Sequence, residues 1–290
     1  DAIIHIVDAS GSSDSEGNPV EAGSHDPLQD VEFVRREMTM WIFGILDKHW
    51  QKIQRQAQSK TYSVHRGIAD IFTGLKVAPE DVMDAERSAG IDLVHADQAA
   101  LVRFCEEIVR ISKPTLDVGN RVDLAPDGLV ERLRAAGLLF ATAAGELALR
   151  NAVAAGLIRY HPGDPAFSVV RDDALSPAQK AGLRTLAQVM EKFGGTGVQQ
   201  AINRAIRDLL HMIVVYPVED EHRFSDSKGR VLPDAFLMRE GSTPRDLAYQ
   251  VHTDIGKGFL YAVDARTNMR VKDTYQMKDG DIIRIVSTAK

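Results

Sequence analysis

A short polar segment, Asn120-Arg-Val-Asp123, directly follows an apolar segment at Pro114–Gly119. The apolar segment has the composition of a buried strand, so the four residues are expected to form the loop at its end. The carboxylate can accept hydrogen bonds, the amide can donate and accept them, and the long basic side chain can cover a flat ligand. Taken alone, so short a pattern arises by chance in many proteins, and it favours an ordinary polar loop.

The tetrad resembles the Asn-Lys-x-Asp loop of P-loop GTPases, with Arg121 in place of the usual lysine. The resemblance implies that Asp123 accepts hydrogens from N1 and the exocyclic N2 of guanine. Adenine has no such donor pair, and an unmatched buried carboxylate is costly, so the loop would discriminate between the bases. The resemblance also implies that Asn120 binds the base and joins neighbouring loops, while the stem of Arg121 covers the ring.

A second loop, Thr142-Ala143, follows Asp123 by about 19 residues and ends the next predicted strand. It resembles the Ser-Ala pair with which GTPases turn a backbone N–H toward the guanine carbonyl. Ala144 occupies the position where an acidic residue often follows this pair. The run Glu146–Arg150 resembles the Glu-Leu-Ala-Leu-Arg sequence of archaeal YchF-like proteins. This context favours a nucleotide site over a plain polar loop.

The resemblance extends over essentially the whole chain. Residues 1–10 resemble the strand that follows the second switch region, and residues 195–199 and 213–221 resemble the junction with the last domain. Four carboxy-terminal segments resemble a TGS domain, which is a β-grasp module: Leu232-Pro-Asp-Ala235, Gly241-Ser-Thr243, Asp246-Leu-Ala248 and His252-Thr-Asp254. The sequence is similar to the Obg family of P-loop GTPases, in its YchF-like branch.

The order of elements predicts an α/β fold in three parts. Strands that alternate with helices indicate part of a parallel GTPase sheet, from residues 1–27 and 114–212. Helical periodicity indicates an insertion over residues 28–113. Residues 213–290 indicate the TGS domain, a small mixed sheet with one helix that starts at Thr243.

More detailed expectations concern single elements. The apolar run at Ala2–Val7 is typical of a strand buried on both faces of a parallel sheet. In the insertion, a second helix is expected over roughly Trp50–Thr73, and Trp41 and Trp50 are expected to anchor the core. In the last domain, Val231–Leu237 is expected to be a strand.

Two GTPase motifs are absent from this sequence: Gly-x-x-x-x-Gly-Lys-Ser/Thr, which cradles phosphates, and the Asp-x-x-Gly of the second switch. The chain opens at Asp1 directly into an apolar strand, so we expect it to be a fragment that lacks the amino-terminal part. We therefore expect no GTP hydrolysis by the chain as it stands. The resemblance implies GTP as ligand, with Mg²⁺ bound in the intact protein only.

Composition narrows the classes of protein. The net charge of −6 argues against a surface that wraps nucleic acid, and no run approaches the ~20 apolar residues that span a membrane. Cys105 is the only cysteine and suits a reducing cytoplasm, where we expect it to be a core residue. The spacing of Asp8, Asp14, Glu16, His25 and Asp26 fits no metal template, so no metal site is predicted.

The leading hypothesis is a guanine-nucleotide-binding regulatory GTPase that acts on ribosomes or other translation components. Residues 213–290 hold twelve basic and twelve acidic side chains, yet Lys257, Arg266, Arg270 and Lys272 gather near Phe259 and Tyr261. Such a patch could bind RNA or could be a plain solvated face. A non-catalytic adaptor that binds RNA or protein through the TGS domain, and an ATP-preferring YchF-like ATPase, are the alternatives.

Overall fold

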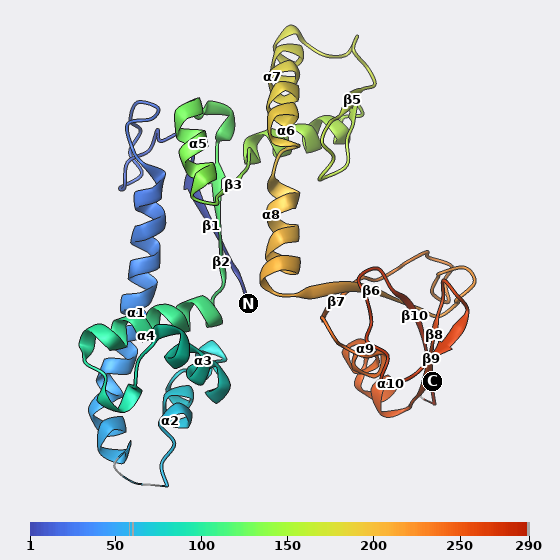
Figure 1. Ribbon diagram of the computed structural model, residues 1–290. Helices are drawn as coiled ribbons and strands as arrows, with labels where there is room; N and C mark the ends of the chain where they lie inside the picture. Colours follow the sequence, from blue (N-terminus) through green and yellow to red (C-terminus); the bar gives the residue numbers. More distant parts are fainter. Residues whose placement is uncertain (58, 60, 289–290) are drawn as a thin grey trace. The chain divides into compact units, whose positions relative to one another are not determined.

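A computed structural model describes residues 1–57, 59 and 61–288 (Figure 1). The chain forms two compact units, unit 1 at Asp1–Ala205 and unit 2 at Ile206–Lys290. Both combine helices with a sheet, so the predicted α/β class is confirmed. The three domain ranges expected from the sequence stay a prediction.

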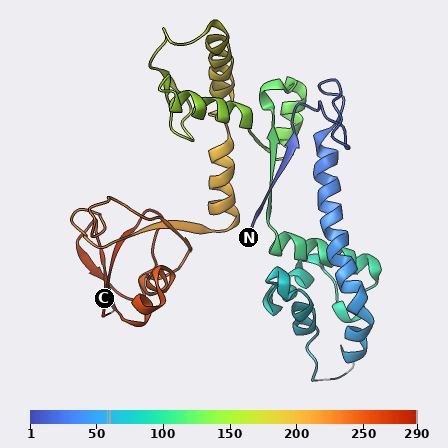
Figure 2. The same cartoon turned by 180° about the vertical axis from the view of Figure 1, so that it is seen from behind.

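Unit 1 is organised around a parallel three-stranded sheet with the order β1-β2-β3. Strands β1 (Ile3–Asp8) and β2 (Thr115–Asn120) pair over six residues, from Ile3 opposite Thr115 to Asp8 opposite Asn120. Strand β3 (Leu139–Phe140) is short and pairs with the end of β2. The two long strands lie side by side from both directions of view (Figure 1, Figure 2). Their carboxyl ends therefore meet at one edge.

Helices cover the two faces of this sheet unequally. Helices α1 (Pro27–Ala57) and α5 (Asp127–Ala135) share one apolar cluster with the sheet, and α8 (Val198–Arg204) contacts β2. That cluster consists of Val7, Ala9, Val31, Leu129, Leu133 and Leu138. Ile4 and Ile6 are exposed, so the expectation that this strand is buried on both faces is wrong. Ile4 and Ile6 alternate with His5 and Val7, so they point to the face opposite α1, and their exposure shows that this face is uncovered at β1.

A buried carboxylate joins α1 to the sheet. Asp117 on β2 is 7% exposed and lies directly opposite His5 on β1. His5 Nδ1 lies 2.9 Å from one Asp117 oxygen, and the Arg35 guanidinium of α1 lies 2.5 Å from the other. Burying a carboxylate is costly unless it is paired, so these contacts fix where α1 crosses the sheet.

Four helices fill the segment between β1 and β2. After α1 come α2 (Val64–Ile71), α3 (Pro79–Ala89) and α4 (Gln98–Ser112), with short 3₁₀ turns at Thr73–Leu75 and Leu93–His95. Asp97 caps α4 by accepting a hydrogen bond from the Ala100 N–H. The second helix expected over Trp50–Thr73 is wrong, because α1 runs unbroken to Ala57 and Ser63 caps a new start.

The core of this helical segment contains one tryptophan, not two. Trp50 is 7% exposed and follows Ile42 and Leu46 at four-residue intervals, so all three face the core. Trp41 is 56% exposed, and its expected role as a core anchor is wrong. Cys105 is fully buried, as expected, and burial raises the pKa of its thiol to about 12.

The remainder of unit 1 follows β2 along the chain. It contains a 3₁₀ turn at Val122–Leu124, α6 (Ala143–Ala154), the β4 (Ile158–Arg159) and β5 (Ser168–Val169) hairpin, and α7 (Pro177–Phe193). Helix α6 starts at Ala143, because the Thr142 hydroxyl caps it by accepting a hydrogen bond from the Gly145 N–H at 3.2 Å. The short hairpin was not expected from the sequence.

Unit 2 is a five-stranded mixed sheet of order β7-β6-β10-β8-β9. Its strands are β6 (Met212–Val218), β7 (Phe236–Arg239), β8 (Phe259–Asp264), β9 (Met269–Val271) and β10 (Ile282–Ser287). Helix α9 (Pro244–Val251), capped by Thr243 as expected, and α10 (Thr253–Lys257) complete it, and a π-helical turn at Ala205–Leu209 precedes it. The strand expected from Val231 begins only at Phe236.

The loop before α8 fits tightly against β3, which gives a stability prediction. Gly197 has φ +80°, and a Cβ atom there would lie 1.8 Å from the Phe140 carbonyl oxygen. We expect Gly197→Ala to lower the free energy of unfolding by about 3 kcal/mol or more, because both the backbone and the neighbouring carbonyl resist it. Gly182→Ala on α7 is the control, with open space for its methyl group and a gain of up to about 1 kcal/mol. Chemical denaturation of both variants measures the difference, and equal stabilities would contradict the packing seen here.

Candidate nucleotide-base site

The candidate site lies where β1 and β2 end. In parallel register, Asp8 closes β1 directly opposite Asn120, which closes β2. The loop after β2 and the start of α6 meet beyond this edge, because β3 returns the chain to the side of β2. The edge of a parallel sheet at its carboxyl ends is a common place for ligands.

Asn120 connects the two loops predicted to hold the base. Its side-chain oxygen accepts a hydrogen bond from the Ala143 N–H, at 3.0 Å. In addition, the Val122 N–H donates to the Ala141 carbonyl at 3.3 Å. These bonds hold the Asn120–Asp123 loop against the Thr142–Ala143 turn.

Arg121 is directed toward β1. Its backbone has φ +62°, a left-handed conformation that is uncommon for residues other than glycine. Its guanidinium lies 2.8 Å from an Asp8 carboxylate oxygen, and the side chain is 43% exposed. The predicted role of its stem, to cover a base, stays a prediction.

The Asp8 carboxylate is surrounded by donors. Hydroxyl groups of Ser10, Ser12 and Ser13 donate to it, together with the Ser10 N–H and Arg121. Burial raises the pKa of Asp8, but the serine hydrogen bonds and the Arg121 charge outweigh this effect, so its pKa lies below the ordinary value. Asp8 is therefore a fixed anion that holds Arg121.

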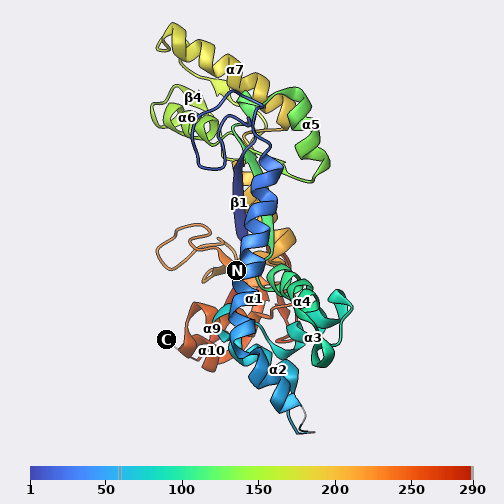
Figure 3. The same cartoon turned by 90° about the vertical axis from the view of Figure 1, so that its left-hand side faces the viewer.

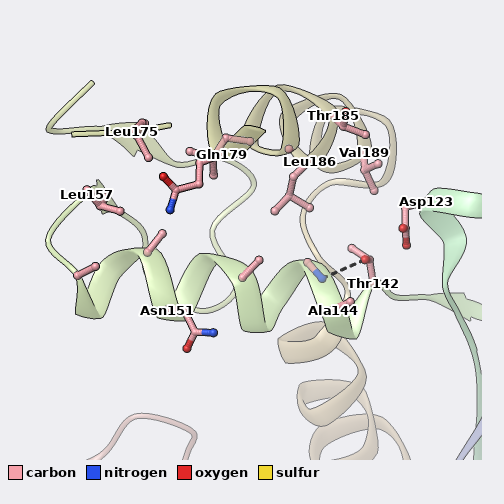
Figure 4. A pocket seen from close by; sticks show the side chains of 16 residues that line it. Asp123, Thr142, Ala144, Asn151, Leu157, Leu175, Gln179, Thr185, Leu186 and Val189 are labelled. Carbon is pink, nitrogen blue, oxygen red and sulfur yellow. Dashed lines mark hydrogen bonds between the residues drawn. The ribbon is translucent and has the colours of Figure 1, made fainter. Parts of the chain in front are cut away.

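Asp123 is the carboxylate that points away from such contacts. It is exposed and lies in the 3₁₀ turn at Val122–Leu124. Together with Thr142 and Ala144 it lines a cavity of about 600 Å³. Figure 4 shows Asp123 at one end of this cavity, beside the start of α6. Its oxygens are placed to accept hydrogens from a ligand.

The cavity continues as an apolar groove between α6 and α7, with a wall of small and aliphatic side chains. Away from Asp123 and Thr142 it is lined by Ala144, Gly145, Ala148, Asn151, Ala152, Ala155, Leu157, Leu175, Gln179, Gly182, Leu183, Thr185, Leu186 and Val189. A flat ligand at its polar end would therefore contact an apolar surface on one side.

The first turn of α6 leaves one amide for a ligand. The Ala143 N–H donates to Asn120, the Gly145 N–H to the Thr142 hydroxyl, and the Glu146 N–H to the Thr142 carbonyl. Within the part of the chain that the structure describes, no acceptor bonds the Ala144 N–H. This donor lies at the rim of the cavity and at the positive end of α6.

A buried carboxylate fixes the start of α6 from behind. Glu146 is 4% exposed and accepts hydrogen bonds from the Tyr160 hydroxyl (2.7 Å), the Thr196 hydroxyl (2.7 Å) and Arg150 (2.6 Å). Burial alone would raise the pKa of Glu146. The three donors lower it by more than burial raises it, so the pKa lies below the ordinary value. The Thr142 N–H also donates to the Thr196 carbonyl at 2.9 Å.

Four of the predicted site residues lie close together in the structure. Asn120 bonds Ala143, and Asp123 and Thr142 line the same cavity. Sequence reasoning missed the anchoring function of Glu146 and the free N–H of Ala144. A signal for Glu146 was present, since an acid that falls on the apolar side of a helix needs donors from elsewhere.

The acidic loop that was considered as a metal site, from Asp8 to Asp26, does not bring its side chains together around one point. His25 pairs with Asp30 at 2.9 Å, Asp26 pairs with Arg132 at 2.6 Å, and the Asp14 carboxylate accepts from Asn18. Among the described residues there is no group of three or more His, Cys, Asp or Glu side chains that could hold a metal ion. No helix of the described chain is long and apolar enough to cross a membrane.

Comparison with known proteins identifies relatives along the whole chain. Residues 118–220 match a family described as Obg-like GTPase YGR210-like, G4 motif-containing domain, and residues 228–287 match the TGS domain. The chain is 42% identical to the uncharacterized GTP-binding protein MJ1332 of Methanocaldococcus jannaschii, over 100% of this chain and 74% of that protein.

Two solved structures are similar. The GTP-binding protein from Pyrococcus horikoshii OT3 matches with a TM-score of 0.75 and 41% identity, over 99% of this chain and 78% of that one. The YchF GTPase of Schizosaccharomyces pombe matches with a TM-score of 0.53 and 13% identity, over 99% and 72%. This second likeness concerns the fold alone.

The Glu146 network predicts acid sensitivity. Because the folded-state pKa is depressed, Glu146 contributes stability above its unfolded pKa, and this contribution is lost as the pH falls through its folded pKa. We expect Glu146→Gln to cost about 2 kcal/mol at neutral pH and less at acid pH. Denaturation across acid and neutral pH measures this, with Glu131→Gln in an exposed pair with Arg134 as control, where the expected change is about 0.5 kcal/mol or less. An equal loss at every pH would show that Glu146 is not ionised in this network.

Proposed function

The chain belongs to the YchF-like branch of the Obg-like GTP-binding proteins, and we propose that the Asn120–Asp123 loop and the start of α6 bind the base of a guanine nucleotide. One observation carries the proposal. The Asn120 side chain bonds the Ala143 N–H, and this places the exposed Asp123 carboxylate and the unpaired Ala144 N–H around one cavity. The two Asp123 oxygens are acceptors and the Ala144 N–H is a donor. This set matches guanine, whose edge offers the N1 and N2 hydrogens beside a carbonyl oxygen.

Each group has a role in the proposed complex. Asp123 accepts from N1–H and the exocyclic N2–H₂ of guanine, and an N–H at the start of α6 donates to the base carbonyl. Asn120 holds the two loops together, and the stem of Arg121 lies over the ring. Adenine would present a lone pair at N1 to the Asp123 carboxylate, and this mismatch favours GTP over ATP.

The phosphate end of the nucleotide requires other residues. The described side chains do not fit a Mg²⁺ site, since the Asp8 oxygens are taken by serine hydroxyls and Arg121. In the protein family, Mg²⁺ and phosphates are expected at the two motifs that this sequence does not contain. We assign GTP hydrolysis, with Mg²⁺, to a protein that carries those motifs, and base recognition to this chain.

We also propose that the TGS domain contacts RNA or the ribosome, in the cytoplasm. The supporting observation is a cation–π pair in which the Arg270 guanidinium lies 4.2 Å from the centre of the Tyr261 ring. Lys257, Arg266 and Lys272 are exposed nearby in sequence. An aromatic ring held beside basic groups suits stacking and phosphate contacts. This makes the protein a candidate regulator of translation.

Base recognition can be tested without phosphates. We expect saturation-transfer NMR to detect binding of guanosine but not adenosine to this chain, because Asp123 needs two adjacent donors. In Asp123→Asn an amide donor replaces one acceptor, so guanosine binding should fall at least about tenfold. Xanthosine, which carries an oxygen in place of the N2 amino group, should bind this variant better than it binds the parent chain.

A matched control is Asp127→Asn, four residues along the chain, because the Asp127 side chain is exposed and pairs with Lys192 away from the cavity. Guanosine binding should be unchanged in this variant. Adenosine binding as tight as guanosine binding would show that the base assignment is wrong and would support the ATP-preferring alternative. The assignment would also be wrong if Asp123→Asn changed the binding of neither guanosine nor xanthosine.

The RNA proposal predicts a charge effect. We expect Arg270→Ala to weaken binding of a single-stranded RNA and to reduce the slope of log affinity against log salt concentration by about 1, because one phosphate contact is lost. Filter binding at several salt concentrations measures both values, with Lys228→Ala in an exposed turn of unit 2 as control. Undetectable RNA binding by the parent chain would favour the protein-binding adaptor.

A further inference from the structure

Helix α1 carries a second apolar row on the side away from its core. Phe33, Met40 and Trp41 are 63%, 43% and 56% exposed, and their spacing puts them on one face. The buried row that contains Ile42 and Leu46 lies on the opposite side of the helix. Figure 3 turns this side of the molecule toward the viewer, and there α1 lies in front of β1, with α4 beside it. Three large apolar side chains on one solvent-facing row mark a contact surface.

A glycine continues this row one turn beyond Trp41. Gly44 is eleven residues after Phe33, and a Cβ atom there would meet nothing within 4 Å. Glycine weakens the interior of a helix relative to alanine, and the fold of this chain does not require it here. A helix position without a side chain allows a second helix to come close.

The row is self-complementary in one arrangement. If two copies of α1 lie antiparallel with a two-fold axis between residues 42 and 43, positions equally far from that point face each other. Trp41 then faces Gly44, a large side chain against an open position. Glu37 faces Lys48 at the next turn, and Phe33 faces Lys52 beyond it.

The charges in this arrangement are available. Glu37, Lys48 and Lys52 are exposed and form no ion pair with another residue in the described part of the chain. Antiparallel pairing sets acid against base and cation against ring. Parallel pairing would instead set Glu37 against Glu37 and Trp41 against Trp41, which is unfavourable for both charge and volume.

We propose that two copies of this chain associate through the outer face of α1, antiparallel, with Trp41 of each copy packed on Gly44 of the other. The pair is isologous, so every contact occurs twice and a single substitution acts on both ends. The proposal does not depend on nucleotide binding, because none of these residues lines the base cavity.

Sedimentation of the 290-residue chain over a concentration series tests the pairing. We expect a monomer–dimer equilibrium that Glu37→Lys or Lys48→Glu each weakens about tenfold or more, since either change creates two like-charge contacts. The double variant Glu37→Lys/Lys48→Glu should recover the parent affinity, because it restores both opposite-charge pairs in reversed order.

Two further variants separate the surface from the fold. Gly44→Gln should give a monomer whose thermal stability is equal to or above that of the parent, because the helix gains a better helix former while the close approach is blocked. Met83→Lys on α3, where Met83 is 41% exposed, should leave the dimer unchanged. A parent chain that stays monomeric, or a double variant no tighter than the single variants, would overturn the proposal.

Discussion

Parallel pairing of β1 with β2 is the constraint on which the site depends. The two strands are separated by the whole four-helix segment, yet they match residue for residue from Ile3 opposite Thr115 to Asp8 opposite Asn120. A slip of one residue would turn His5 away from Asp117 and leave this buried carboxylate without one of its two partners. The register therefore fixes which polar residues reach the edge of the sheet.

Two carboxylates fix the surroundings of the site, and a third is left free. Asp8 holds Arg121 on one side, and Glu146 holds the start of α6 on the other. Both are saturated with donors, so neither is available to a ligand. Among the residues that the structure describes, Asp123 has no such partners, and it is exposed at the cavity. A rigid frame around one unsatisfied acceptor is what selective recognition of a base edge requires.

The sequence indicated part of the candidate site because its residues follow predicted strands directly. Asn120 and Asp123 come after one strand, and Thr142 with Ala143 ends the next. These short patterns alone favour ordinary polar loops, and their interpretation as a base site came from the resemblance to GTPases and stays a prediction. The contact of Arg121 with Asp8 spans 113 positions, and no local pattern indicates it. The fold class followed from alternating strands and helices in the same way.

Errors in the sequence interpretation arose where burial depends on tertiary packing. Trp41 and Trp50 are equally apolar, and only the rotation of α1 against α2 to α4 decides which one is buried. The boundary between α1 and α2 was also misplaced. No glycine or proline lies between Ala57 and Ser63, so the sequence carries no strong signal for a break, and the cap at Ser63 marks the start of the new helix.

The continuity of α1 gives its outer face a structural consequence. At 31 residues, α1 is about 46 Å long. Near its start Val31 packs on the sheet cluster and Arg35 bonds Asp117, and farther along Ile53 lies in the core of the helical segment. One straight element thus fixes the helical segment to the strands that carry the site. A partner bound to the outer face of α1 would be held in fixed register with the edge formed by Asp8 and Asn120, since no loop intervenes between that face and the sheet contacts.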